Sequence, residues 1–332
     1  MVVHRLPHSK PTMNKQLLSL TMLALVPLLS GCTADDSAGA SWEDGTAVYF
    51  RTTASDMTRA VVGGTFTDDE TFRVFATSES GGTRKVFIPD DGTSNVVSYG
   101  LVIPDASYNS AYYGMRGWHT QTPYYWNDED TYNFYAVHPA SAPNITASQV
   151  DNYTTVALSY EVPATAGQDL LYATKVGERR KTVGVALTFH HALCRVTIGK
   201  TEENGVTLLL NSITLKNIKH SGTFNFGTAA WTADNGICDY SYGTTLDGAL
   251  LLLPQTLADN ALITVSYKIL AEDGSYVQGS ENEWAEKDIS LSGVWLADRT
   301  YHYSLTANFD IRLSVSIDPW SEGVGDSCGL EL

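Results

Sequence analysis

Hydrophobic and polar residues alternate along most of this chain. In the clearest run, residues 311–317, every second residue is apolar and the residues between are polar or charged. Because successive side chains of a β-strand point to opposite faces, a period of two predicts a strand with one buried face. The same period recurs at residues 72–76, 132–136, 156–160, 183–189, 263–269 and 301–305.

Turn signals separate these runs. Pairs such as Gly81-Gly82, Asp91-Gly92 and Asp273-Gly274 favour tight connections between antiparallel strands. No stretch of more than ten residues combines helical spacing of apolar residues with capping residues. The sequence therefore predicts an all-β protein built of antiparallel β-sandwiches.

The length indicates two domains. A chain of 332 residues exceeds one ordinary sandwich and fits two domains of about 150 residues each. The densest charge run, Gly-Glu-Arg-Arg-Lys at residues 177–181, lies between two strand-rich halves. We predict an N-terminal sandwich over residues 41–180 and a C-terminal sandwich over residues 181–332. The alternative is that the charge run forms a hairpin tip inside one domain.

The first residues have the features of an export signal. Lys15 precedes an apolar run at residues 17–29, which is too short for a membrane span. The run ends in Leu29-Ser30-Gly31-Cys32, which resembles a bacterial lipobox. We predict a lipoprotein signal peptide over residues 1–31, a lipid on Cys32 and a flexible tether over residues 32–40. The alternative is an ordinary secretory signal with an incidental cysteine.

The charge of the chain excludes some partners. There are 37 acidic and 21 basic residues, which gives a net charge of −16 at neutral pH. A surface this acidic repels the phosphates of nucleic acids and of anionic membranes. We therefore expect no nucleic-acid partner.

Motifs of catalytic and metal sites are mostly missing. The sequence has no nucleophile elbow, no zinc-protease motif and no phosphate-binding loop. His190 and His191 are neighbours in an alternating run, so their side chains point to opposite faces and do not readily bind one metal ion. We predict no catalytic residue, no metal site and no cofactor; a pair of carboxylates for glycoside hydrolysis stays open as an alternative, because such a pair meets only in space.

The cysteines and one aromatic segment leave alternatives open. Apart from Cys32, the cysteines are Cys194, Cys238 and Cys328, whose spacing fits no zinc motif. Cys194 lies in an alternating run and fits a buried thiol, and one disulfide among the three remains open. The tyrosines and tryptophans of residues 112–126 could stack on sugars, although packing in the core is the simpler interpretation.

Short stretches in a fixed order give a resemblance to a known family. They include Ala-Val-Tyr-Phe at 47–50, Thr-Arg-Ala at 58–60, Phe-Arg-Val-Phe-Ala at 72–76, Tyr-Asn-Phe-Tyr-Ala at 132–136, Leu-Thr-Phe-His-His-Ala-Leu at 187–193 and Pro-Trp at 319–320. In this order they resemble the fimbrillin-like proteins of Bacteroidales, the subunits of type V pili. The resemblance implies two tandem transthyretin-like β-sandwich domains and a structural or adhesive role in a fimbria at the outer membrane. It also implies that the protein is not an enzyme.

The resemblance also implies a route of assembly. In the family, an arginine-specific protease removes the lipidated N-terminal piece with its first strand, and a strand of another subunit fills the groove. Carried onto this sequence, the candidate cleavage site is Arg59-Ala60, and the exchanged strand lies at residues 47–53. Its side chains alternate, so we expect Val48 and Phe50 to fill the core and Ala47, Tyr49 and Arg51 to lie on the other face. The alternative is that Arg59 is an ordinary loop residue, because anchor and tip subunits need not be cut.

The donor strand and the function keep alternatives as well. Residues 311–317 alternate well enough to be donated, or they form the last strand of their own sandwich, whereas the tail 321–332 is too polar to fill a groove. The partners implied are other fimbrial subunits, in a homo- or heteropolymer, and the outer membrane through the lipid. The alternative function is a surface lipoprotein that does not polymerise and binds glycans or host ligands.

Overall fold

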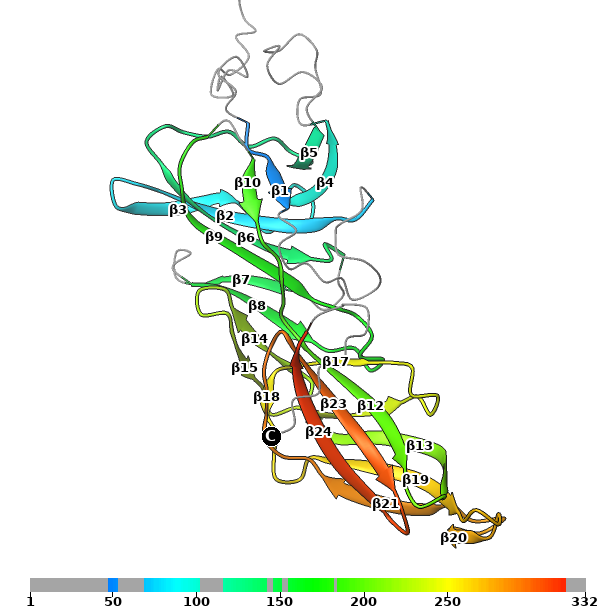
Figure 1. Ribbon diagram of the computed structural model, residues 1–332. Helices are drawn as coiled ribbons and strands as arrows, with labels where there is room; N and C mark the ends of the chain where they lie inside the picture. The colour runs from blue at the N-terminus through cyan, green and yellow to red at the C-terminus, as the bar shows by residue number, and fades with distance from the viewer. Residues whose placement is uncertain are drawn as a thin grey trace, which may run out of the picture.

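The computed structural model describes residues 47–52, 69–101, 116–141, 146–150, 155–181 and 184–320. Cys32, the Arg59-Ala60 bond, Cys328 and the polar tail 321–332 lie outside these ranges. The regular structure of the described residues consists of β-strands, which confirms the predicted all-β class. The sheets follow one another along one long axis (Figure 1). No helix long and apolar enough to cross a membrane occurs in the described ranges.

A nine-stranded sheet forms the N-terminal end of the molecule. Its order is β10-β1-β5-β4-β2-β6-β9-β11, with β3 paired to β2. The sheet closes over itself, because Phe50 of β1 packs against Phe72 of β2 and Phe134 of β6, which are not neighbours of β1 in the sheet. The bounds are β1 (Phe50–Thr52), β2 (Phe72–Ser80), β3 (Thr83–Ile88), β4 (Val96–Leu101), β5 (Arg116–Thr120), β6 (Thr131–His138), β9 (Leu171–Glu178), β10 (Val185–Leu187) and β11 (His190–His191).

Two sheets facing each other form the C-terminal end. One has the order β17-β12-β23-β24, and the other has the order β16-β13-β19-β20 with β21 also paired to β19. Apolar residues of every second position fill the space between them, as the period of two predicts. The bounds are β12 (Cys194–Glu202), β13 (Thr207–Lys219), β16 (Ile237–Tyr242), β17 (Leu250–Leu252), β19 (Leu262–Leu270), β20 (Tyr276–Gln278), β21 (Ala285–Ser290), β23 (Arg299–Ala307) and β24 (Ile311–Pro319).

A smaller sheet lies between these two ends (Figure 1). Its order is β15-β14-β8-β7, formed by β7 (Thr146–Val150), β8 (Thr155–Glu161), β14 (Ser221–Asn225) and β15 (Ala230–Ala233). β8 and β14 pair over five residues, although more than 50 residues separate them in the chain. Aromatic rings fill the junction, with the centroid of Phe226 5.3 Å from that of Phe75.

Strand pairing crosses the predicted domain boundary at three places in the described residues. β8 pairs with β14, β1 pairs with β10, and β9 pairs with β11, so each half contributes strands to sheets completed by the other. The charge run 177–181 begins at the end of β9, where Glu178 forms ion pairs with Lys175 and Lys181. The division into residues 41–180 and 181–332 stays a prediction.

Candidate functional site

The first strand is held by backbone bonds on both sides. β1 runs parallel to β10, with Phe50 opposite Val185, and antiparallel to β5, with Phe50 opposite Trp118. Just before the strand, the amide of Val48 donates a hydrogen bond of 2.8 Å to the carbonyl of Tyr124. The amide of Val185 donates one of 2.8 Å to the carbonyl of Tyr49. The segment 47–52, which ends in β1, is therefore bonded into the N-terminal sheet.

The side chains of this segment fill the N-terminal core. Val48 is 4% exposed and Phe50 is completely buried. The ring of Phe50 meets that of Phe134 edge-on, with 5.6 Å between centroids. Val48 and Phe50 thus occupy the position that the alternation of residues 47–53 predicts for them, and their exchange for a strand of another subunit stays a prediction.

Sequence reasoning missed one residue of this strand. Tyr49 points away from Val48 and Phe50, yet it is also buried. Its ring packs over Gly184, where an added Cβ atom would lie 2.8 Å from a ring carbon. The close approach therefore requires glycine at residue 184. The one signal in the sequence is a large aromatic residue on the expected outer face of the strand.

β1 covers an apolar cleft and two strand edges. The residues around it include Phe72, Trp118, Val185, Leu187 and Phe189, all in the same core. β10 pairs only with β1 among the strands of the sheet, and β5 would keep only β4. Loss of β1 would therefore expose apolar side chains, the backbone groups of β10 along three residues and those of β5 at Trp118. Such edges bind further strands readily.

The aromatic segment 112–126 contributes to the core where the structure describes it. The side chains of Trp118 and Trp126 are buried, and the ring of Trp126 meets that of Tyr132 edge-on at 4.9 Å. Neither indole is available to stack on a sugar. Tyr112 and Tyr113 lie outside the described residues.

β24 is the last strand of its own sheet. It pairs with β23 along nine residues, from Ile311 opposite Ala307 to Pro319 opposite Arg299. It also lies at the edge of the sheet order. Its second half is poorly covered, because Val315 and Ile317 are 51% and 57% exposed although they lie on the apolar side of the alternation. Donation of this strand to another subunit stays a prediction.

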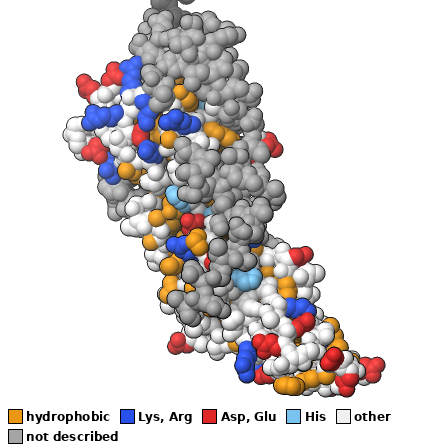
Figure 2. Space-filling model, viewed as in Figure 1, with side chains coloured by type: hydrophobic (Ala, Val, Ile, Leu, Met, Phe, Trp, Pro, Cys, Tyr) orange, Lys and Arg blue, Asp and Glu red, His pale blue; other side chains and the backbone are white. Residues whose placement is uncertain are grey.

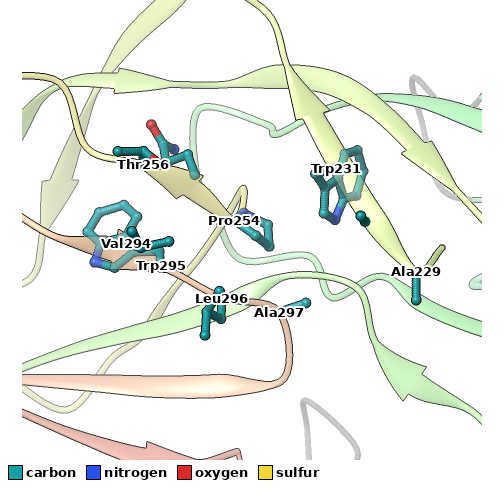
Figure 3. A pocket seen from close by; sticks show the side chains of 10 residues that line it. Ala229, Trp231, Pro254, Thr256, Val294, Trp295, Leu296 and Ala297 are labelled. Atoms are coloured by element: carbon teal, nitrogen blue, oxygen red, sulfur yellow. The ribbon is translucent and has the colours of Figure 1, made fainter.

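One cleft lies beside β15 and β22 (Val294–Trp295). It has a volume of about 280 Å³, and Figure 3 shows Val294 and Leu296 on one side with Trp231 on the other. None of its lining residues is an acid, a base or a cysteine. The amide of Gln255 at its wall is used by the backbone of Lys219, from β13. The cleft therefore offers apolar contacts and no acid–base chemistry.

The histidines and cysteines that could carry chemistry do not form a reactive site in the described residues. His190 is exposed and His191 is buried, where its Nδ1 lies 2.8 Å from Oδ2 of Asp169 and its ring stacks on Trp320 at 3.7 Å. Cys194 is a buried free thiol, and burial raises its pKa far above the ordinary range, so it is not a nucleophile. Cys238 is a second free thiol. In the part of the chain that is described, no three His, Cys, Asp or Glu side chains gather as a metal site requires.

The fold and this site define a class of protein: an all-β chain of stacked sheets whose first strand completes the core and protects two strand edges. Comparison with family models gives the particular family. The fimbrillin-like model matches residues 58–320, and the chain belongs to this family. The family is structural rather than enzymatic, and membership implies a location at the cell surface and supports a role as a fimbrial subunit.

Solved structures agree on the fold. A protein of Bacteroides uniformis assigned to cell adhesion aligns with a TM-score of 0.50 and 14% identity, over 83% of this chain and 98% of that chain. A fimbrial protein of Bacteroides vulgatus aligns with a TM-score of 0.50 and 12% identity, over 83% of this chain and 100% of that chain. No curated protein sequence matches this chain significantly.

Proposed function

We propose that this chain is a structural or adhesive subunit of a cell-surface fimbria that assembles by protease-triggered strand exchange. The observation that carries the proposal is the placement of β1. It is short, it lies between β5 and β10, and its Phe50 closes the N-terminal core together with Val48 just before it. The solved neighbours assigned to cell adhesion and to fimbriae support the same function.

In the proposed route, the lipid on Cys32 first holds the precursor in the outer membrane. Cleavage after Arg59 then releases the piece that contains residues 47–52. The freed cleft keeps the backbone groups of β5 and β10 unpaired and the ring of Phe134 uncovered. A strand of another subunit with two apolar side chains at alternate positions would pair with these backbone groups and cover this ring. The partners are therefore further fimbrial subunits, identical or different.

The experiment that tests this route is to determine the N-terminal residue of the protein from the cell surface. Mass spectrometry of the assembled fraction should find Ala60 at the N-terminus, and the unassembled membrane fraction should begin with lipidated Cys32. Polymers whose subunits all begin at Cys32 would show that assembly does not need cleavage. Such a result would leave an uncut tip or anchor subunit as the function.

A further inference from the structure

Three exposed aromatic side chains belong to neighbouring strands and turns at the end of the molecule opposite β1 (Figure 1). Tyr276 in β20, Trp284 just before β21 and Phe309 in the turn between β23 and β24 are 45%, 40% and 66% exposed. Wherever the structure describes burial, every other Phe, Tyr and Trp side chain is buried or partly buried. Figure 2 shows hydrophobic and acidic side chains gathered at this lower end. We call these three residues the aromatic platform.

A buried lysine fixes two of the rings. Lys268 of the central strand β19 is 7% exposed, and its Nζ lies 4.4 Å from the ring centre of Trp284 and 5.6 Å from that of Tyr276. The same ammonium donates a hydrogen bond of 2.8 Å to the carbonyl of Glu281. Gly279 lets the loop close over this lysine, because it has a φ of +75° and an added Cβ would lie 3.0 Å from Cγ of Lys268.

The turn that carries Phe309 is fixed to the same strands. The side-chain amide of Gln278 in β20 donates a hydrogen bond of 3.1 Å to the carbonyl of Phe309. The next residue, Asp310, accepts one of 3.3 Å from the hydroxyl of Tyr267 and forms an ion pair with Lys287 of β21. The backbone that carries Phe309 is therefore fixed to the strands that carry the other two rings, which lowers the ordering cost of binding.

The charges around the platform limit the chemistry of its ligand. Glu272, Asp273, Glu281 and Glu283 are exposed and lie within four residues of Tyr276 or Trp284 along the chain, so an anionic ligand is repelled. The carboxylates attract a cationic ligand, but the ammonium of Lys268 already lies over the rings of Trp284 and Tyr276, and a second cation at these rings is repelled by it. A neutral ligand avoids both penalties. It would place an apolar face on the rings and hydroxyl donors toward the carboxylates.

We propose that the aromatic platform binds a neutral glycan. A pyranose ring has an apolar C–H face that matches an exposed indole or phenol ring, and its hydroxyl groups donate hydrogen bonds to the flanking carboxylates. This binding needs neither cleavage at Arg59 nor polymerisation. It goes beyond the proposed function, because it gives the subunit a ligand of stated chemistry at the end remote from β1.

The test is binding of the purified full chain to an array of neutral, sialylated and sulfated glycans. We expect neutral glycans to bind, and W284A to lose at least 10-fold in affinity for them by calorimetry. The matched control is L296A, which removes an apolar side chain that is 55% exposed but lies at the cleft beside β22. It should bind as the unchanged chain does. If W284A fails to fold in a thermal melt, Y276S and F309S replace it, with the same loss expected.

Three results would overturn the proposal. Binding that is unchanged in all three platform variants would place the glycan elsewhere. Binding restricted to sialylated or sulfated glycans would contradict the charge argument. If no glycan binds and the platform variants instead lose self-association in sedimentation, the platform is a protein contact between copies of the chain.

Discussion

Phe50 shows how a single side chain can hold a strand that has few backbone partners. The strand has three residues, and one residue pair joins it to β5. Yet Phe50 is completely buried and its ring contacts those of Phe134 and Phe72. Burial of Val48 and Phe50 together contributes roughly 3–6 kcal/mol. Much of the attachment of this strand therefore depends on two side chains, which another strand could supply.

We expect Phe50→Ala to lower the free energy of unfolding of the N-terminal sandwich by about 3–5 kcal/mol, because it removes a buried ring and leaves a cavity. Urea unfolding followed by tryptophan fluorescence measures this, since Trp118 and Trp126 are buried in the same core. Arg51→Ala is the control, because this exposed neighbour should change stability by less than about 0.5 kcal/mol. Equal effects of the two substitutions would contradict the role of Phe50.

Cys32 is the residue on which the predicted membrane attachment depends. Cys32→Ala should remove the lipid and move the protein out of the membrane fraction, as measured by fractionation and metabolic fatty-acid labelling. Cys238→Ala is the control, because that partly buried free thiol should not affect the label. A label that persists on Cys32→Ala would show that the lipid is attached elsewhere.

Alternation predicted the inward residues of the first strand but not the outward one. Val48 and Phe50 follow from the period of two, because one face of a sheet strand packs on the core. Tyr49 is buried by contact with Gly184, which is far away in the sequence, and no local pattern reports such a contact. The sequence thus predicts which residues are buried where the local alternation decides burial. It does not predict burial that results from contact with a distant segment.

At the scale of elements, the sequence predicted where strands occur more accurately than where each strand ends or which strand it pairs with. The run 183–189 read as one strand, but the structure has β10 over Val185–Leu187 and a separate β11 at His190–His191. The apolar positions Val185, Leu187 and Phe189 are nevertheless all buried. In β24 the alternation was clearest, yet Val315 and Ile317 are exposed, because this strand lies at a sheet edge. Position within a sheet, rather than the local pattern, decides such cases.

The first strand as a unit gives the prediction for assembly. Arg59→Ala should leave the precursor folded and block polymer formation, because β1 stays in its cleft and no edge is exposed. Gels of unboiled surface protein should show a ladder of multimers for the unchanged chain and a single full-length band for the variant. Arg51→Ala is again the control, since it keeps the Arg59-Ala60 bond and should form the ladder. Full-length polymers of Arg59→Ala would refute cleavage as the trigger.

At the scale of the whole molecule, the two predicted halves share sheets. The length and the charge run at 177–181 indicated a boundary, but pairing of β8 with β14 and of β1 with β10 joins segments across it. Sequence patterns report the face of a strand and not its partner, so these joins could not be predicted. The aromatic junction around Phe75 and Phe226 adds contacts between the halves.

Limited trypsin digestion tests this arrangement. The first cut should fall at Arg179, Arg180 or Lys181, or at Arg59, and mass spectrometry identifies the site. After a cut at 179–181 the two fragments should elute together in gel filtration, because the shared sheets hold them. A chain with glutamine at residues 179–181 should lose this cut and serves as the control. A first cut between residues 200 and 268, or fragments that separate, would contradict the expected organisation.

The opposite directions of the two neighbours of β1 have a consequence for the shape of a fibre. A strand that restores the present backbone bonds must run parallel to β10 and antiparallel to β5, so only one chain direction fits. Every subunit joined in this way would have the same orientation along the fibre axis as the subunit before it. The fibre would then be polar, with chemically different ends.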